Sequence, residues 1–268
     1  MEIKTIEEVS SEKKRLAASL DILDASMWLG QPEGFPNASA MSFPVLKEAA
    51  NRHFITGGLV SHWSGKTASA QDGNRFLTEE FDSGKNNFYP IWTGLPLFPE
   101  EPGPLPGLSD MPSKVKAVRV FPKTNKFMMS GFVLGSLCKF LIGRSMPLMV
   151  WHTELEWKEL YDLAGDFPDL NIIVETQIRK ILYHMRNLMP LMRERKNVLL
   201  EISNFAGGGF LDYAVGQFGA ERFIFGSFMP VADPFVPVGM LLDASCGENQ
   251  KKMIAGDNLK RIIDGVKS

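Results

Sequence analysis

Short apolar runs alternate with longer segments of helical periodicity along most of this chain. Apolar runs of strand length that are bounded by turn residues or polar segments predict β-strands. The run at residues 147–153 is almost wholly apolar, which is typical of a strand buried on both faces. The pattern predicts eight strands, at residues 20–25, 54–63, 87–96, 115–122, 147–153, 170–176, 198–205 and 222–230.

Most of these strands are followed by a segment that predicts a helix. Pro190 lies within one such segment, and we expect the helix to split or kink there because proline removes a backbone donor. The Pro-rich, acidic segment 96–112 has no periodicity and predicts a loop. The predicted helices lie at residues 68–81, 130–145, 154–169, 177–197, 207–219 and 248–266.

The alternation of strands and helices predicts parallel βαβ units and therefore an α/β fold. Eight such units in about 250 residues favour a closed (β/α)8 TIM-type barrel with extra terminal helices. An open, doubly wound sheet is the alternative, but no Gly-x-Gly-x-x-Gly fingerprint follows the first strand. The sequence has no internal repeat and no domain boundary, so we predict one barrel domain over residues 1–268.

Composition narrows the class of protein. The chain has 268 residues, a net charge of -2 and 44% hydrophobic residues, which excludes a disordered chain. There is no basic excess, so we expect no nucleic-acid partner. No apolar run of about 18 residues exists and the N-terminus lacks an apolar signal core, so we expect no membrane association and a cytoplasmic location. Two cysteines cannot form a disulfide framework or a four-thiolate zinc site.

In a barrel of this kind the active site lies at the carboxyl ends of the strands. The residues predicted at those ends mix acids, bases and aromatic side chains, which is typical of a small-molecule pocket. We therefore expect a small-molecule ligand or substrate as the partner. The residues at these strand ends are Asp24, Ser26, Trp28, His62, Trp63, Trp92, Thr93, Arg119, Lys123, His152, Glu154, Glu175, Thr176, Glu201, Ser203, Asn204, Ser227, Phe228 and Asp233.

Several motifs resemble those of one family in the right order. The segment ILDASMWLG at residues 22–30 resembles the first-strand motif Asp-Ala-His-x-His-Leu-Gly of the amidohydrolase-related (amidohydrolase-2-like) family, in the metal-dependent hydrolase superfamily. The segments PLMVWHT, NIIVET, NVLLEISNF, RFIFGSFMPVADP and MIAGDNLKRII resemble its later motifs. The resemblance covers nearly the whole chain and implies a TIM-barrel hydrolase or decarboxylase. It also implies that a homodimer is to be expected.

The same resemblance implies that most metal ligands of the family are replaced. Its two first-strand histidines correspond to Ser26 and Trp28, its strand-six histidine to Thr176 and its strand-eight aspartate to Phe228. Only His152 keeps its ligand type. Because a catalytic zinc needs about three protein ligands, we predict no metal centre, no cofactor and no hydrolysis by the family's usual mechanism.

Each candidate also has a simpler interpretation. His152 is either a catalytic acid or base or a hydrogen-bonded pocket histidine without a catalytic role. His62 is a substitute base or ligand, or a packed loop histidine. Arg119 either clamps a substrate carboxylate or forms a salt bridge with Glu175 or Glu201 inside the barrel. The carboxylates that end neighbouring strands are an acid and base pair, or they neutralise Arg119.

Three functional hypotheses follow. The first is a divergent, metal-free barrel with a small-molecule pocket at its mouth, which as a pseudoenzyme would bind a metabolite such as an organic acid held by Arg119. The second is an active hydrolase or decarboxylase-like lyase on a small organic acid or ester. It would use His152 with Glu175, Asp24 or Glu154, or one divalent metal such as zinc in a rearranged site that includes His62. The third is a structural or regulatory subunit.

Overall fold

The computed structural model describes residues 6–35, 37–81, 86–96, 111–177, 179–205, 207 and 209–267. Eight parallel strands form one sheet in chain order, from β1 to β8. The sheet closes because the Ala25 N–H donates to the Phe225 carbonyl at 3.0 Å and the Trp28 N–H to the Met229 carbonyl at 2.9 Å. The strands are β1 Ile22–Leu29, β2 Ile55–His62, β3 Phe88–Thr93, β4 Ala117–Val120, β5 Leu148–Trp151, β6 Ile172–Glu175, β7 Val198–Glu201 and β8 Phe223–Ile224.

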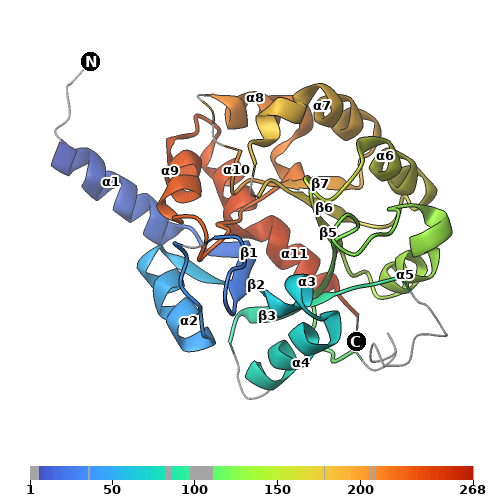
Figure 1. Ribbon diagram of the computed structural model, residues 1–268. Coiled ribbons are helices and arrows are strands. Elements are labelled where there is room, and N and C mark those ends of the chain that lie inside the picture. The colour runs from blue at the N-terminus through green and yellow to red at the C-terminus, as the bar shows by residue number, and fades with distance from the viewer. Residues whose placement is uncertain are drawn as a thin grey trace.

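Helices surround the barrel, while α11 lies across its base and α1 extends away from it (Figure 1). The α-helices are α1 Ile6–Ser19, α2 Phe43–Arg52, α3 Ser64–Thr67, α4 Ala70–Glu80, α5 Gly131–Gly143, α6 Trp157–Asp166, α7 Met185–Glu194, α8 Phe210–Phe218, α9 Phe235–Asp243, α10 Glu248–Lys252 and α11 Asn258–Gly265. Within the described residues, the 3₁₀ helices η2 Ile181–His184 and η3 Ala220–Arg222 and the π-helix η4 Met253–Asp257 complete the fold.

The predicted TIM-type barrel and all eight predicted strands are confirmed. Helices α1, α2 and α9 were not predicted. The prediction that Pro190 splits its helix was wrong, because α7 continues through Pro190 and the change of helix type lies at His184. Most of the predicted loop 96–112 lies outside the described residues.

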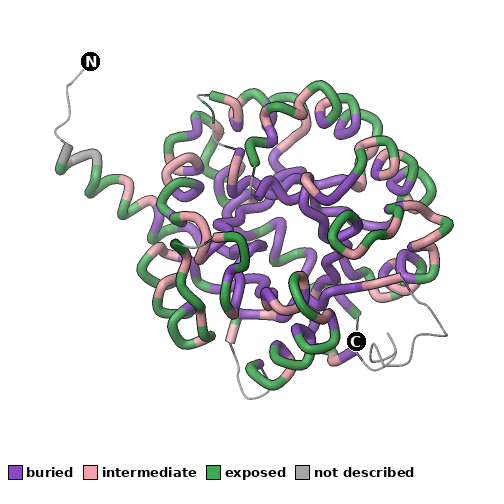
Figure 2. Tube along the Cα trace, viewed as in Figure 1, coloured by how far each residue is buried: buried purple, intermediate pink, exposed green. Residues whose placement is uncertain are grey.

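Side chains alternate between the outside of the barrel and its interior, and the strands are buried on both faces (Figure 2). The lower interior is an apolar cluster to which most strands contribute one residue, and α11 seals it from below with Leu259, Ile262 and Ile263. The apolar base means that polar chemistry can only be placed higher, toward the carboxyl ends of the strands. Within the described part of the chain, no helix is long and apolar enough to span a membrane.

Candidate functional site

Five aromatic side chains close the mouth of the barrel, and we call them the aromatic cap: Trp28, Trp63, Phe121, Trp151 and Phe228. The ring centroid of Trp28 lies 4.6 Å from that of Trp63 and 5.3 Å from that of Trp151. The Phe228 ring lies 5.7 Å from the Trp151 ring. Each of the five is at most 4% exposed. The cap therefore fills the place where a barrel enzyme ordinarily presents its reacting groups.

Three indole N–H groups of the cap have no hydrogen-bond partner among the described residues. They are the buried Nε1 atoms of Trp28, Trp63 and Trp151. A buried indole N–H usually finds an acceptor, and an unpaired buried donor costs about 1–3 kcal/mol. The cap thus contains unused donors that an acceptor-bearing molecule would satisfy.

A layer of buried polar residues lies beneath the cap, and Arg119 is its only cation among the described residues. Its guanidinium donates to both Glu175 carboxylate oxygens, at 2.7 and 2.6 Å, and also to the Ser61 hydroxyl. The guanidinium carbon lies 4.5 Å from the centre of the Trp28 ring. Of the two interpretations of Arg119, the structure therefore shows the internal salt bridge with Glu175.

Glu201 belongs to the same layer and is fully buried. Its Oε2 accepts from the Thr176 N–H and the Ser203 hydroxyl, both at 3.0 Å. Its Oε1 accepts from the Ser203 N–H at 2.5 Å and from the Ser26 hydroxyl at 3.4 Å. Burial, followed by repulsion from Glu175, raises the pKa of Glu201 to about 8.

Asp24 lies at the seam between β1 and β8. Its Oδ1 accepts from the Ser26 N–H at 2.8 Å and the Ser227 N–H at 3.0 Å, while its buried Oδ2 has no partner among the described residues. Burial raises the pKa of Asp24 to about 6, against the opposing effect of these hydrogen bonds. Asp24 thus connects β1 to the segment after β8 and stabilises the closed barrel.

His152 points away from the barrel mouth, contrary to our expectation. Met149 and Trp151 of β5 face the interior, so alternation directs the next side chain outward. The His152 ring packs 5.5 Å from the ring of His184, and its Nδ1 lies 3.2 Å from the Glu175 carbonyl. Its Nε2 is buried without a partner among the described residues, and burial lowers the pKa of His152 to about 4.

His62 and Glu154 also lie outside the polar layer. The His62 Nδ1 accepts from the Ser64 N–H at 3.2 Å, its ring packs 5.0 Å from the Phe76 ring, and burial lowers its pKa. Glu154 accepts from the N–H and hydroxyl of Thr124 and pairs with the Lys66 ammonium at 3.3 Å. Both residues tie loops together at the rim of the barrel.

The remaining candidates connect the cap to the layer below. The Ser26 hydroxyl contacts Glu201 and also accepts from the Phe228 N–H at 3.1 Å. The Thr176 hydroxyl accepts from the Asn204 N–H at 2.8 Å. The structure therefore brings Asp24, Ser26, Trp28, Arg119, Glu175, Thr176 and Phe228 into one connected region, and leaves His62, His152 and Glu154 outside it.

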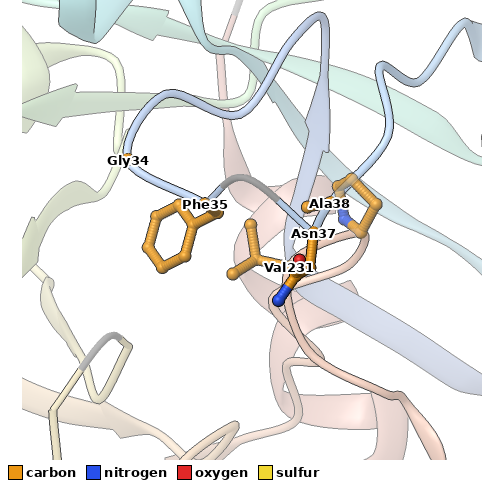
Figure 3. Close-up of a pocket in the computed structure, with 6 residues that line it drawn as sticks. Gly34, Phe35, Asn37, Ala38 and Val231 are labelled. Atoms are coloured by element: carbon orange, nitrogen blue, oxygen red, sulfur yellow. The ribbon is translucent and has the colours of Figure 1, made fainter.

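An open depression of about 300 Å³, which we call the mouth depression, lies beside the cap at the β7 and β8 side. A second depression of about 260 Å³ also has Phe35 and Val231 in its lining, together with Gly34, Asn37, Ala38 and Pro230 (Figure 3). Sequence reasoning missed Phe35 and Val231, because loop positions carry no periodicity. The mouth depression is lined by Phe35, Ser203, Asn204, Phe228, Val231, Ala232, Val236 and Pro237.

The side chains at the implied metal position do not fit a divalent ion. Trp28, Trp151 and Phe228 place apolar rings there. Glu175 is paired with Arg119, and Glu201 is saturated by backbone and hydroxyl donors. Within the described residues, no group of three or more His, Cys, Asp or Glu side chains is placed to hold a metal. No step of a mechanism is therefore assigned to a metal here.

Solved structures of known proteins share this fold. A dihydroxybenzoic acid decarboxylase from a Polaromonas species, solved with manganese and the inhibitor 2-nitroresorcinol, matches with a TM-score of 0.70 at 12% identity, over 91% of this chain and 97% of that one. Amidohydrolase 2 from Bifidobacterium longum subsp. infantis matches with 0.67 at 13% identity, over 92% and 99%. An uncharacterised TIM-barrel protein from Bordetella bronchiseptica matches with 0.67 at 14% identity, over 92% and 99%.

No protein-family model matches the sequence, and no curated protein matches it. At these identities the structural likeness establishes the fold. The fold is the one that the amidohydrolase-related motifs imply, and it extends over nearly the full length of each neighbour.

Proposed function

We propose that this protein binds a small molecule in the mouth depression and does not perform the metal-dependent hydrolysis of the amidohydrolase-related family. The observation that carries this proposal is the aromatic cap, which fills the centre of the mouth with Trp28, Trp151 and Phe228. Arg119 and Glu175 lie buried beneath it and satisfy each other. The mouth depression beside the cap is open to solvent.

The mouth depression has the character of a binding site. It lies at the carboxyl end of the barrel, where ligands of this fold class bind. Six of its eight lining residues are apolar, and Ser203 and Asn204 supply the polar groups. Phe228 forms its inner wall in a left-handed conformation, with φ of 60°. Such strain in a bulky residue is often found at functional sites.

Calorimetric titration with a panel of small aromatic compounds, neutral and anionic, tests this proposal. We expect saturable binding of at least one compound without added metal. Val236→Trp provides the control, because Val236 is 55% exposed at the rim and a larger side chain there fills the depression without disturbing the core. Binding that survives this substitution, or no saturable binding at all, would contradict the proposal and favour a structural or regulatory subunit.

A second candidate, favoured by a different observation, is a lyase or hydrolase on a small organic acid or ester. The unpaired indole donors of Trp28, Trp63 and Trp151 would suit the oxygens of such a substrate, and a solved structure of the same fold is a decarboxylase. This candidate requires the cap to open. The set of His152, Asp24 and Glu175 that the sequence suggested does not surround one space in the structure.

Turnover assays separate the two candidates. The protein is incubated with small aromatic acids and esters, with and without zinc or manganese, and the released CO₂ or acid is measured. The second candidate predicts turnover that Trp151→Phe reduces, since phenylalanine keeps an aromatic ring but loses the donor. The first candidate predicts no turnover under either condition.

A further inference from the structure

The mouth depression favours a neutral ligand. None of its lining residues is charged. Two cations contact the rings of the aromatic cap, and both already have carboxylate partners: Arg119 pairs with Glu175, and Lys66 pairs with Glu154. A carboxylate placed in the depression would lose water without gaining a counter-charge, which is costly.

The hydroxyl of Ser203 is oriented from below by Glu201. The two Glu201 oxygens each face a backbone N–H, from Thr176 and from Ser203 itself, and an N–H can only donate. When Glu201 is ionised, the Ser203 hydroxyl must also donate to it, at 3.0 Å. The described residues give the Ser203 hydroxyl oxygen no other partner, and Ser203 is one of the residues that line the depression.

Resting on the proposed ligand-binding function, we infer that Ser203 is the specificity-determining group of the mouth depression: it accepts a hydrogen bond from a neutral, flat, apolar molecule that carries a hydroxyl or amino donor. Phe35 and Phe228, whose centroids lie 5.9 Å apart at 83°, supply an aromatic surface for the body of such a molecule. Asn204, half-buried beside Ser203, supplies an amide that both donates and accepts.

The protonation state of Glu201 controls how strongly the Ser203 hydroxyl favours a ligand that donates a hydrogen bond. Once Glu201 is protonated, its acid hydrogen can only be accepted by the hydroxyl of Ser203 or Ser26, because its other partners are N–H donors. A hydroxyl that accepts this hydrogen turns its own hydrogen outward and no longer favours a donor. The ionisable group that acts directly on Glu201 is Glu175 on β6. Glu175 is in turn paired with Arg119 on β4 and lies near Asp24 on β1, and the Ser26 hydroxyl lies between Asp24 and Glu201. Selectivity for donors is therefore strongest at alkaline pH.

The test compares two matched probes, 2-naphthalenemethanol and its methyl ether, by isothermal titration calorimetry at about pH 9 and about pH 6. At the higher pH we expect the alcohol to bind roughly three- to tenfold more tightly than the ether, the worth of one hydrogen bond between neutral groups. Ser203→Ala should reduce the affinity for the alcohol to that for the ether and leave the ether unchanged. Glu201→Gln should remove the pH dependence of the preference.

Further variants distinguish a failure of the role given to Ser203 from a failure of the proposed ligand-binding function. Ser203→Thr keeps the hydroxyl and should keep the preference, which guards against a general effect of substitution at this position. Equal binding of the two probes by the unmodified protein, or an equal loss of both in Ser203→Ala, would overturn the role of Ser203 while the pocket stands. If neither probe binds, or if Val236→Trp changes nothing, the proposed function is overturned together with this inference.

Discussion

At the scale of single residues, Arg119 has the largest electrostatic consequence. Its guanidinium is buried, donates two hydrogen bonds to the Glu175 carboxylate and packs on Trp28. Because the Arg119 guanidinium is buried, its charge is compensated by the Glu175 carboxylate and not by bulk water. The ion pair thus makes it possible to bury a carboxylate at the centre of the barrel.

Removing one partner of this pair should be strongly destabilising. Arg119→Met leaves Glu175 buried and unpaired, and we expect a loss of about 3–5 kcal/mol in the free energy of unfolding. Urea denaturation measures this loss. The double variant Arg119→Met with Glu175→Met should recover part of it, and Lys158→Met, in an exposed pair with Asp162, should have no measurable effect. A double variant no more stable than the single one would contradict this account.

Glu201 should make stability depend on pH. Its folded-state pKa of about 8 lies above the ordinary value of 4.5, so the folded state holds the proton more tightly. The stability that it contributes is fully present below about pH 4.5 and is lost as the pH rises through about 8. Melting temperatures of the protein and of Glu201→Gln, measured from about pH 5 to pH 8, should show a shallower decline in the variant. Parallel declines would exclude Glu201 as the titrating group.

At the scale of elements, the segment that follows β8 leaves room for the Glu201 carboxyl at Gly226. A Cβ atom at Gly226 would clash with the Glu201 Oε1 and would lie 2.5 Å from the Ser26 Oγ. We expect Gly226→Ala to cost about 1–3 kcal/mol, the usual range for overpacking. Gly143→Ala is the matched control, since a Cβ there meets nothing within 4 Å. Chemical denaturation of both variants measures the difference, and equal stabilities would show that the segment after β8 has more room at Gly226 than its contacts indicate.

The sequence predicted elements better than side-chain directions. Strands buried on both faces leave apolar runs, so all eight were found. At the end of a strand, an error of one residue in the register reverses the face to which a side chain points. In β5 the interior position belongs to Trp151, and His152 next to it faces outward. In β1 a register shift between Asp24 and Met27 interrupts the alternation, which no pattern reveals. Helix α9 was missed because its sequence, FVPVGMLLD, contains an internal Pro and little polar periodicity.

At the scale of the whole molecule, the fold follows from local patterns and the site does not. The (β/α)8 order was predictable because each unit repeats the same alternation. The aromatic cap combines side chains from five separate parts of the chain, and the mouth depression joins loops from both ends of it. The sequence showed that Trp28 and Phe228 stand at positions where the resemblance implies metal ligands. Their packing against Trp151 could not be predicted, because the closed barrel brings these rings together.

The central claim is that aromatic side chains occupy the place of a metal centre. Elemental mass spectrometry of protein purified without chelators and supplemented with zinc and manganese tests it most directly. The account predicts less than about a tenth of an equivalent of any transition metal, because a zinc site needs about three protein ligands. Metal at near-stoichiometric content that is lost in His152→Ala or His62→Ala would contradict it, and would show that the mouth rearranges around a rebuilt metal site.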